Sequence, residues 1–351
     1  MNLDNNFLSW KKVIIILIIG IGIWILIPKL IGLKQTLELL KQVKYWAFFL
    51  ALFAESFFYI GSTILTKAVL GMTGDKLKFK EVLQISLLDS FSVQFLPFGS
   101  LGEGTVSYFF YKEKKIRTSH IILMFIARTI ILYLVFAAIY LIGVAFSPTN
   151  HSLSPNALIV IWFAYLAAFA GFFYLISLYF RKSVLIQRAA QIAKIINKIT
   201  RILHIGLIPL SHFPEAVQKF YDALKMLAKN RHLQINAALG AVLFWAGDIL
   251  CLYFSLLGFG YRAHLPIVIF AYSAAKILAL ITFIPGGLGI VEGSLALIFI
   301  GFGVPASTAL AAVLIFRFIS FWIPVPIGLA SFIHLRRNDI KTNLEKIISI
   351  G

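Results

Sequence analysis

Charged residues are scarce in this chain. Asp, Glu, Lys and Arg together make up 13% of its 351 residues, and hydrophobic residues make up 60%. Soluble domains are about half apolar and about a quarter charged. This composition excludes an ordinary soluble domain and predicts an integral membrane protein.

Cysteine is nearly absent as well. Cys251 is the single cysteine of the sequence, which excludes an intrachain disulfide. The seven His residues are scattered, without the spacing of metal ligands or of a nucleophile and its base. There is no Walker motif, and the Gly-rich run at 286–293 lacks the GxGxxG spacing of a nucleotide-binding loop. We expect no metal, no cofactor and no self-contained ATP-driven pump.

Acidic residues are few relative to basic ones. There are 14 Asp and Glu against 32 Lys and Arg, so the formal net charge is +18. Such a charge can indicate nucleic-acid binding, but the basic residues here lie between apolar runs rather than on a soluble domain. We expect no nucleic acid, and we expect the anionic cytoplasmic leaflet of the membrane to be their partner.

Long apolar runs are what the sequence has in abundance. About 20 consecutive apolar residues span a bilayer as a helix. Six runs qualify, and they lie at 14–31, 45–69, 120–146, 157–180, 233–257 and 306–333. We interpret the first as a retained anchor helix rather than a cleaved signal peptide. The chain is therefore expected to form a single all-α, polytopic membrane domain over residues 1–351.

The distribution of Lys and Arg predicts the orientation of these spans. Cytoplasmic loops are enriched in Lys and Arg. The segment 181–232 holds ten of them and the loop 147–156 holds none, so we expect the first in the cytoplasm, together with both termini, and the second outside. Within 181–232, apolar residues recur at helical spacing and predict a basic amphipathic helix, which either lies on the membrane or packs against the bundle.

Two further apolar blocks, 82–111 and 266–303, are each interrupted by Pro and Gly. The first contains FLPFGSLGEG at 95–104 and the second contains FIPGGLGIVEG at 283–293. Each block is expected to form a hairpin that either re-enters the membrane or crosses it twice. The residues that break the helices are Pro97, Gly99, Gly102, Pro285, Gly286, Gly287 and Gly289.

The two broken blocks belong to a longer repeat. Glu103 precedes Arg128 by 25 residues, and Glu292 precedes Arg317 by 25. Repeat one covers about 45–146 and repeat two about 233–333. The charged loops place the first block between cytoplasmic ends and the second between external ends, so the repeats are predicted to be inverted, an arrangement found in transporters.

Ionisable residues inside a membrane need partners or a polar cavity. The Glu and Arg of each repeat can form an ion pair that fastens the hairpin, or the Arg can receive the phosphate of a lipid head group. Asp89 and Lys276 occupy equivalent positions with opposite charge, and they either pair or line the cavity. Asp248 and Glu55 are weaker cavity candidates. The predicted substrate-binding residues are Glu103, Arg128, Glu292, Arg317, Asp89 and Lys276.

The stretch from Phe283 to Gly328, FIPGGLGIVEGSLALIFIGFGVPASTALAAVLIFRFISFWIPVPIG, resembles the signature of the lysylphosphatidylglycerol synthase/flippase transmembrane family. The earlier LPFGSLGEG and Arg128 resemble that family's first-half motif. The resemblance implies a stand-alone, flippase-like member of the UPF0104 type. Only 14 residues follow Arg337, so we expect no soluble aminoacyltransferase domain and no synthase activity.

The expected function is transport of a lipid between the leaflets of the cytoplasmic membrane. The expected substrate is an anionic or aminoacylated phospholipid, or a polyprenyl-phosphate lipid. Two alternatives are an integral-membrane transferase that acts on a lipid and a non-transporting partner of a lipid-modifying enzyme.

Overall fold

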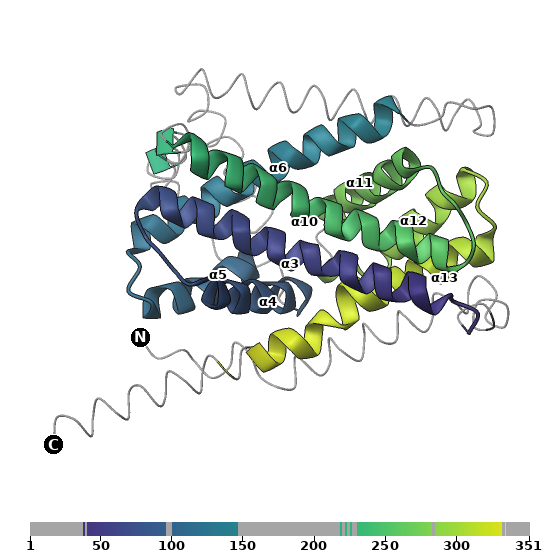
Figure 1. Cartoon of the computed structure of the whole chain (residues 1–351), viewed down its shortest axis with the longest axis horizontal. Helices are drawn as coiled ribbons and strands as arrows, with labels where there is room; N and C mark the ends of the chain where they lie inside the picture. The colour runs from purple at the N-terminus through teal and green to yellow at the C-terminus, as the bar shows by residue number, and fades with distance from the viewer. Residues whose placement is uncertain are drawn as a thin grey trace, which may run out of the picture.

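The computed structural model of the chain is built of helices throughout the part that it describes (Figure 1). That part comprises residues 38, 41–95, 100–146, 218–219, 222, 225–226, 230–282, 285–331 and 334. The predicted spans at 14–31 and 157–180 lie outside the described residues, and so do most of the basic segment 181–232 and its amphipathic helix.

The helices follow the hydropathy of the sequence. In chain order they are α3 (Tyr45–Thr73), α4 (Phe79–Phe95), α5 (Ser100–Glu113), α6 (Thr118–Ala145), α10 (Arg231–Gly258), α11 (Leu265–Thr282), the 3₁₀ turn η2 (Pro285–Gly287), α12 (Ile290–Gly301), α13 (Ala306–Arg317) and the π-helix η3 (Phe318–Trp322). Among the described residues, four helices are long and apolar enough to cross a membrane, at Tyr45–Thr73, Thr118–Gly143, Arg231–Gly258 and Ala306–Ser331. These four confirm the predicted spans at 45–69, 120–146, 233–257 and 306–333.

Helices α3 and α10 form the centre of the bundle, side by side and antiparallel (Figure 1). The backbone N–H of Lys44, at the start of α3, donates to the carbonyl of Gly258 at the end of α10, with an N···O distance of 3.0 Å. Small residues bring the two backbones together: a Cβ atom on Gly61 would lie 2.5 Å from the carbonyl oxygen of Gly240. Close contact between small residues is the usual way in which membrane helices associate, because lipid provides no hydrophobic drive between them.

The remaining helices pack around this pair in two similar groups. In the first group, α3 packs against α4 and α6, and α4 packs against α5. In the second group, α10 packs against α11 and α13, and α11 packs against α12. The largest side chains that are fully buried come from both groups, among them Tyr111, Tyr272, Phe299 and Phe316.

Both interrupted blocks are pairs of short helices. The block 82–111 becomes α4 and α5, and their junction at 96–99, which holds Pro97 and Gly99, lies outside the described residues. The block 266–303 becomes α11 and α12, joined through η2. The second block is thus interrupted at Pro285–Gly287, within its Pro and Gly run, and the break of the first block at Pro97 and Gly99 stays a prediction.

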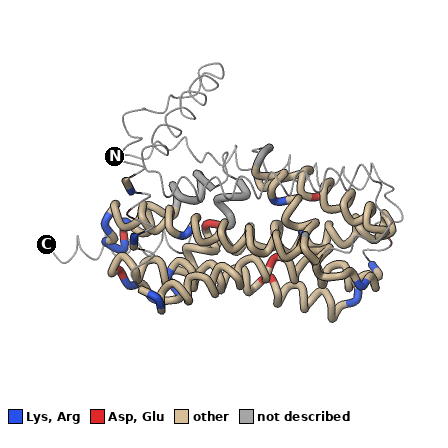
Figure 2. Tube along the Cα trace, turned by 90° about the horizontal axis from the view of Figure 1, so that it is seen from above, with Lys and Arg blue, Asp and Glu red and all other residues tan. Residues whose placement is uncertain are grey.

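Charged residues lie mostly at the two ends of the bundle, and Figure 2 shows few of them along its length. One end carries the α3–α4 loop at 74–78 and the α5–α6 loop at 114–117, which are rich in Lys and Arg. The opposite end, where α3 begins and α10 ends, carries Lys44 and Arg262. The described bundle therefore has one strongly basic end and one weakly basic end.

Candidate functional site

The second helix break is a turn that requires glycine. Gly286 has a φ of 61° and Gly289 a φ of 81°, in the left-handed region that residues with a Cβ atom avoid. The site of the Cβ atom on Gly286 is also filled, since it would lie 2.3 Å from the ring of Phe321. The turn therefore depends on glycine for its dihedral angles and for its space.

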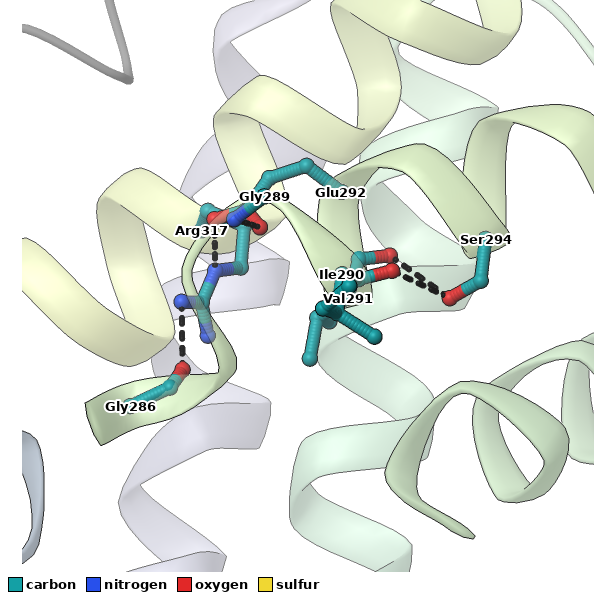
Figure 3. A network of polar contacts seen from close by, with 7 residues as sticks. All are labelled: Gly286, Gly289, Ile290, Val291, Glu292, Ser294 and Arg317. Atoms are coloured by element: carbon teal, nitrogen blue, oxygen red, sulfur yellow. Dashed lines mark hydrogen bonds and ion pairs between the residues drawn. The ribbon is translucent and has the colours of Figure 1, made fainter. Parts of the chain in front are cut away.

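Glu292 and Arg317 form a buried ion pair beside this turn (Figure 3). Arg317 Nε lies 2.6 Å from Glu292 Oε1, and the exposed fractions of the two side chains are 5% and 1%. Arg317 Nη2 also donates to the carbonyl of Gly286 over 2.8 Å. The second oxygen of the Glu292 carboxylate accepts from the backbone N–H of Gly289 over 2.8 Å, so the carboxylate also caps the N-terminus of α12, where a negative charge is favourable. The two side chains thus connect α13, α12 and the turn.

The helix that carries Arg317 changes its geometry directly after this residue. Residues Phe318–Trp322 form one turn of π-helix, η3. Single π-helical turns inside longer helices are rare and occur frequently at functional sites. The turn places the ring of Phe321 under the guanidinium group, with 4.4 Å from Arg317 Cζ to the ring centroid. Arg317 is therefore held on three sides: by a carboxylate, a carbonyl and an aromatic ring.

Arg128 lies in a polar cluster of the first group of helices. Its Nη2 donates to the hydroxyl of Ser62 on α3 over 3.2 Å, and Ser62 donates in turn to Ser86 on α4 over 3.3 Å. One helical turn further along α4, Asp89 accepts a hydrogen bond from Ser107 on α5. All five side chains are buried, and Arg128 is 8% exposed. Arg128 and Asp89, which the sequence predicted as site residues, thus belong to two hydrogen-bonded sets that lie one helical turn apart on α4.

The first-half counterpart of the Glu292–Arg317 pair is only partly described. Glu103 lies on α5, and Gly102, which was predicted to break the helix, lies inside α5 because this helix begins at Ser100. The side chain of Glu103 is outside the described residues. The prediction that Glu103 and Arg128 pair stays a prediction. Ser62 was not predicted, because serine occurs on many membrane helices and gives no signal in a single sequence.

Lys276 has a partner that the sequence did not rank highly. Its Nζ lies 3.0 Å from Asp248 Oδ2, so its ion pair is with α10 and not with Asp89, the pairing that the repeat suggested. The hydroxyl of Tyr272 donates to the same oxygen of Asp248 over 2.5 Å. Glu55, on α3, is 4% exposed and is close enough to Asp248 and Lys276 to interact with both charges. The two weaker candidates, Glu55 and Asp248, therefore belong to a buried ionic group.

A cavity of about 360 Å³ opens at the weakly basic end of the bundle. Lys44 and Arg262 provide two cationic groups at this cavity, and Trp46 and Tyr253 provide two aromatic rings. Trp and Tyr are enriched at the interface between membrane and water. The cavity therefore combines cationic and aromatic side chains, a combination that suits the interface between membrane and water.

Comparison with known proteins assigns the chain to a family. The sequence profile of the lysylphosphatidylglycerol synthase transmembrane region matches residues 12–328, which is most of the chain. The chain belongs to this family. All the predicted break residues and all the predicted site residues lie within the matched residues 12–328.

Curated relatives of this family member are UPF0104 membrane proteins of archaea. One from Pyrococcus horikoshii is 33% identical over 112 residues, which are 32% of this chain and 33% of that protein. One from Methanothermobacter thermautotrophicus is 28% identical over 116 residues, or 33% of this chain and 34% of that protein. One from Methanocaldococcus jannaschii is 22% identical over 335 residues, covering 93% of this chain and 96% of that protein. The chain thus matches about a third of the first two relatives and nearly all of the third.

Proposed function

We propose that this protein moves a phospholipid, or another lipid with a phosphate-bearing head group, between the leaflets of the cytoplasmic membrane. The observation that carries the proposal is the buried guanidinium group of Arg317 at a glycine turn between two short helices. A guanidinium group binds phosphate through paired hydrogen bonds. The name of the family, which refers to a lipid synthase, supports a lipid as the ligand.

The packing of the helices supports two inverted repeats. Helices α3 and α10 begin the two repeats and run antiparallel, which is what a pseudo-twofold axis in the membrane plane requires. Each is followed by a broken hairpin and then by a long helix that carries an Arg, and the helix pairs that pack within one repeat correspond to those in the other. In transporters with inverted repeats, the substrate site lies near the midplane at interrupted helices.

The lengths of the hairpin helices favour re-entry over full crossing. The arms α4, α5, α11 and α12 have 17, 14, 18 and 12 residues. At a rise of 1.5 Å per residue they extend about 26, 21, 27 and 18 Å, less than the roughly 30 Å of a hydrocarbon core. We infer that each turn lies at membrane depth, where an irregular backbone is tolerated only beside protein or a water-filled cavity.

In this arrangement the Glu292 carboxylate holds Arg317 while no lipid is bound, and a lipid phosphate replaces it during transport. Arg128 offers a second guanidinium group in the equivalent helix of the other repeat. The cavity beside Lys44 and Arg262 receives the head group at the weakly basic end of the bundle, with the acyl chains remaining in the membrane. Arg128, Arg317 and this cavity together provide cationic groups inside the bundle and at one of its faces.

Transport of labelled lipids in liposomes tests the proposed function. Purified protein is reconstituted with trace amounts of a fluorescent anionic phospholipid, an aminoacylated phospholipid or a polyprenyl phosphate, and the exchange of label between leaflets is timed. We expect faster exchange of at least one of these lipids than in protein-free liposomes. If none is accelerated, the protein is not a flippase for this class of lipid, and an enzyme that co-purifies with the inactive chain would favour a partner role instead.

The inverted orientation of the two hairpins leads to a second prediction. Positive loops face the cytoplasm, so the 74–78 loop before the first hairpin lies inside and the 259–264 loop before the second lies outside. In a Cys251→Ala background, Lys76→Cys should resist a membrane-impermeant thiol reagent in intact cells and react after permeabilisation, whereas His264→Cys should react in both. Equal accessibility of the two cysteines would contradict the inverted arrangement.

A further inference from the structure

A buried group of ionisable side chains lies outside the sites of Arg317 and Arg128. Glu55 comes from α3, Asp248 and Cys251 from α10, and Tyr272 and Lys276 from α11. We propose that this group holds one proton on Glu55, and that uptake and release of a second proton by the group drive the lipid movement proposed above. The coupling rests on the proposed function, whereas the proton site stands on the geometry of the group.

The two carboxylates of the group differ in the partners that they have. Asp248 Oδ2 accepts from the Tyr272 hydroxyl over 2.5 Å and faces the Lys276 ammonium at 3.0 Å. Glu55 lies where α3 packs on α10, since a Cβ atom on Gly247, the residue before Asp248, would lie 2.9 Å from the carbonyl oxygen of Ala54. Among the described residues, Glu55 Oε2 is buried and has no hydrogen-bond partner, and the same holds for Asp248 Oδ1. Asp248 thus has a cation and a phenol as partners, and Glu55 has neither.

The charges of the group do not balance without a proton. Two carboxylates and one ammonium group leave a net charge of −1, because Tyr272 and Cys251 are neutral donors. A buried ion without a counter-ion is strongly unfavourable in a membrane interior. One proton on a carboxylate makes the group neutral. The proton belongs on Glu55 rather than Asp248, since Lys276 and Tyr272 both stabilise the charged form of Asp248.

Among the described residues, the titratable groups that interact with Glu55 are Asp248 and Cys251 on α10 and Tyr272 and Lys276 on α11. Helix α10 packs against both α3 and α11 and so brings these groups together. The side chain of Lys276 is 32% exposed and that of Asp248 is 3% exposed. Lys276 thus lies between the buried Asp248 carboxylate and the surface of the bundle.

The position of Lys276 links proton binding to the second hairpin. Lys276 lies on α11, which leads into the η2 turn that holds Arg317. A movement of this hairpin that frees Arg317 for a lipid phosphate also moves Lys276 away from Asp248. The two carboxylates then lack their cation, and the Asp248 carboxylate binds a second H⁺ and becomes a carboxylic acid, while Glu55 keeps its proton. Return of Lys276 favours the reverse step, in which Asp248 releases that H⁺ and pairs with Lys276 again.

Infrared spectroscopy of the reconstituted protein tests the proton site without any transport assay. A protonated buried carboxyl group gives a C=O stretching band separate from that of carboxylates. We expect this band in the wild type at neutral pH, its loss in Glu55→Gln, and its retention in the control Glu81→Gln, which alters a carboxylate on the bundle surface. A wild type without the band, or a band that persists in Glu55→Gln, would overturn the proton site.

Transport under an imposed pH gradient tests the coupling. The rate of lipid exchange in the wild type and in Glu81→Gln should change several-fold when the gradient is applied, and the rate in Asp248→Asn should not respond. If the rate of lipid exchange in the wild type does not change with the gradient, the coupling is overturned and the proposed function stays intact. A band assigned to Glu55 together with no exchange of any lipid overturns the proposed function and the coupling, and leaves the proton site in place.

Discussion

Arg317→Ala is expected to lower the free energy of unfolding by about 3–5 kcal/mol, because it leaves the carboxylate of Glu292 buried without a cation. The exposed fractions of the Arg317 and Glu292 side chains are only 5% and 1%, so water cannot replace the lost partner. The carbonyl of Gly286 loses its donor from Arg317 as well. Chemical denaturation in detergent micelles measures the effect.

A second ion pair of nearly equal length provides the matched control. Lys114 Nζ lies 2.7 Å from Glu81 Oε1, but these side chains are 38% and 28% exposed. Lys114→Ala should therefore cost about 0–1 kcal/mol, as is typical of ion pairs at the surface. If Arg317→Ala and Lys114→Ala had equal, small effects, the Glu292–Arg317 pair would not be what holds the turn.

A double substitution separates fastening from substrate binding. In Glu292→Gln/Arg317→Met, the amide oxygen can still accept from Gly289, methionine fills the space of the arginine, and no buried charge is left alone. Replacing a buried ion pair by uncharged side chains of similar volume is often neutral for stability, so much of the loss in Arg317→Ala should be recovered. Lipid exchange should be absent in the double variant, because no guanidinium group remains at the turn. Recovery of exchange together with stability would show that Arg317 only fastens the hairpin.

The sequence predicted those features that depend on local patterns. A long apolar run was enough to predict the span at α10. Pro285 and the glycines that follow it were enough to predict the break before α12. The partnership of Glu292 and Arg317 also followed from sequence, since the same spacing of 25 residues separates Glu103 and Arg128. Ionisable residues inside a membrane need partners, so an ion pair was one of the two roles expected for this Glu and Arg.

Features that depend on tertiary packing were not predictable in this way. Lys276 pairs with Asp248 because α11 packs beside α10, whereas the repeat alone suggested Asp89 as its partner. Asp248 and Glu55 lie 193 positions apart on helices that pack antiparallel, and no periodicity or motif brings them together. The buried ionic group is a consequence of the α3–α10 contact, which the sequence analysis did not predict.

Gly61→Ala tests that contact and is expected to destabilise the protein, although alanine favours an isolated helix by about 1 kcal/mol over glycine. The added Cβ atom would lie 2.4 Å from the backbone nitrogen of Phe244 and 2.5 Å from the carbonyl oxygen of Gly240. Backbone atoms cannot rotate away as a side chain can, so α3 and α10 must separate. Overpacking of this kind costs about 1–3 kcal/mol, and thermal unfolding in detergent micelles measures it.

Gly293→Ala is the control for this experiment, because it makes the same change inside helix α12 at a position where the added Cβ atom meets nothing within 4 Å. It should leave stability unchanged or raise it by up to about 1 kcal/mol. Equal effects of the two substitutions would contradict the close approach of α3 and α10.

Gly61 lies less than two helical turns from Glu55, so a separation that Gly61→Ala forces also draws Glu55 away from Asp248. Any Gly61→Ala protein that still folds should therefore lose the pH dependence of lipid exchange before it loses exchange itself.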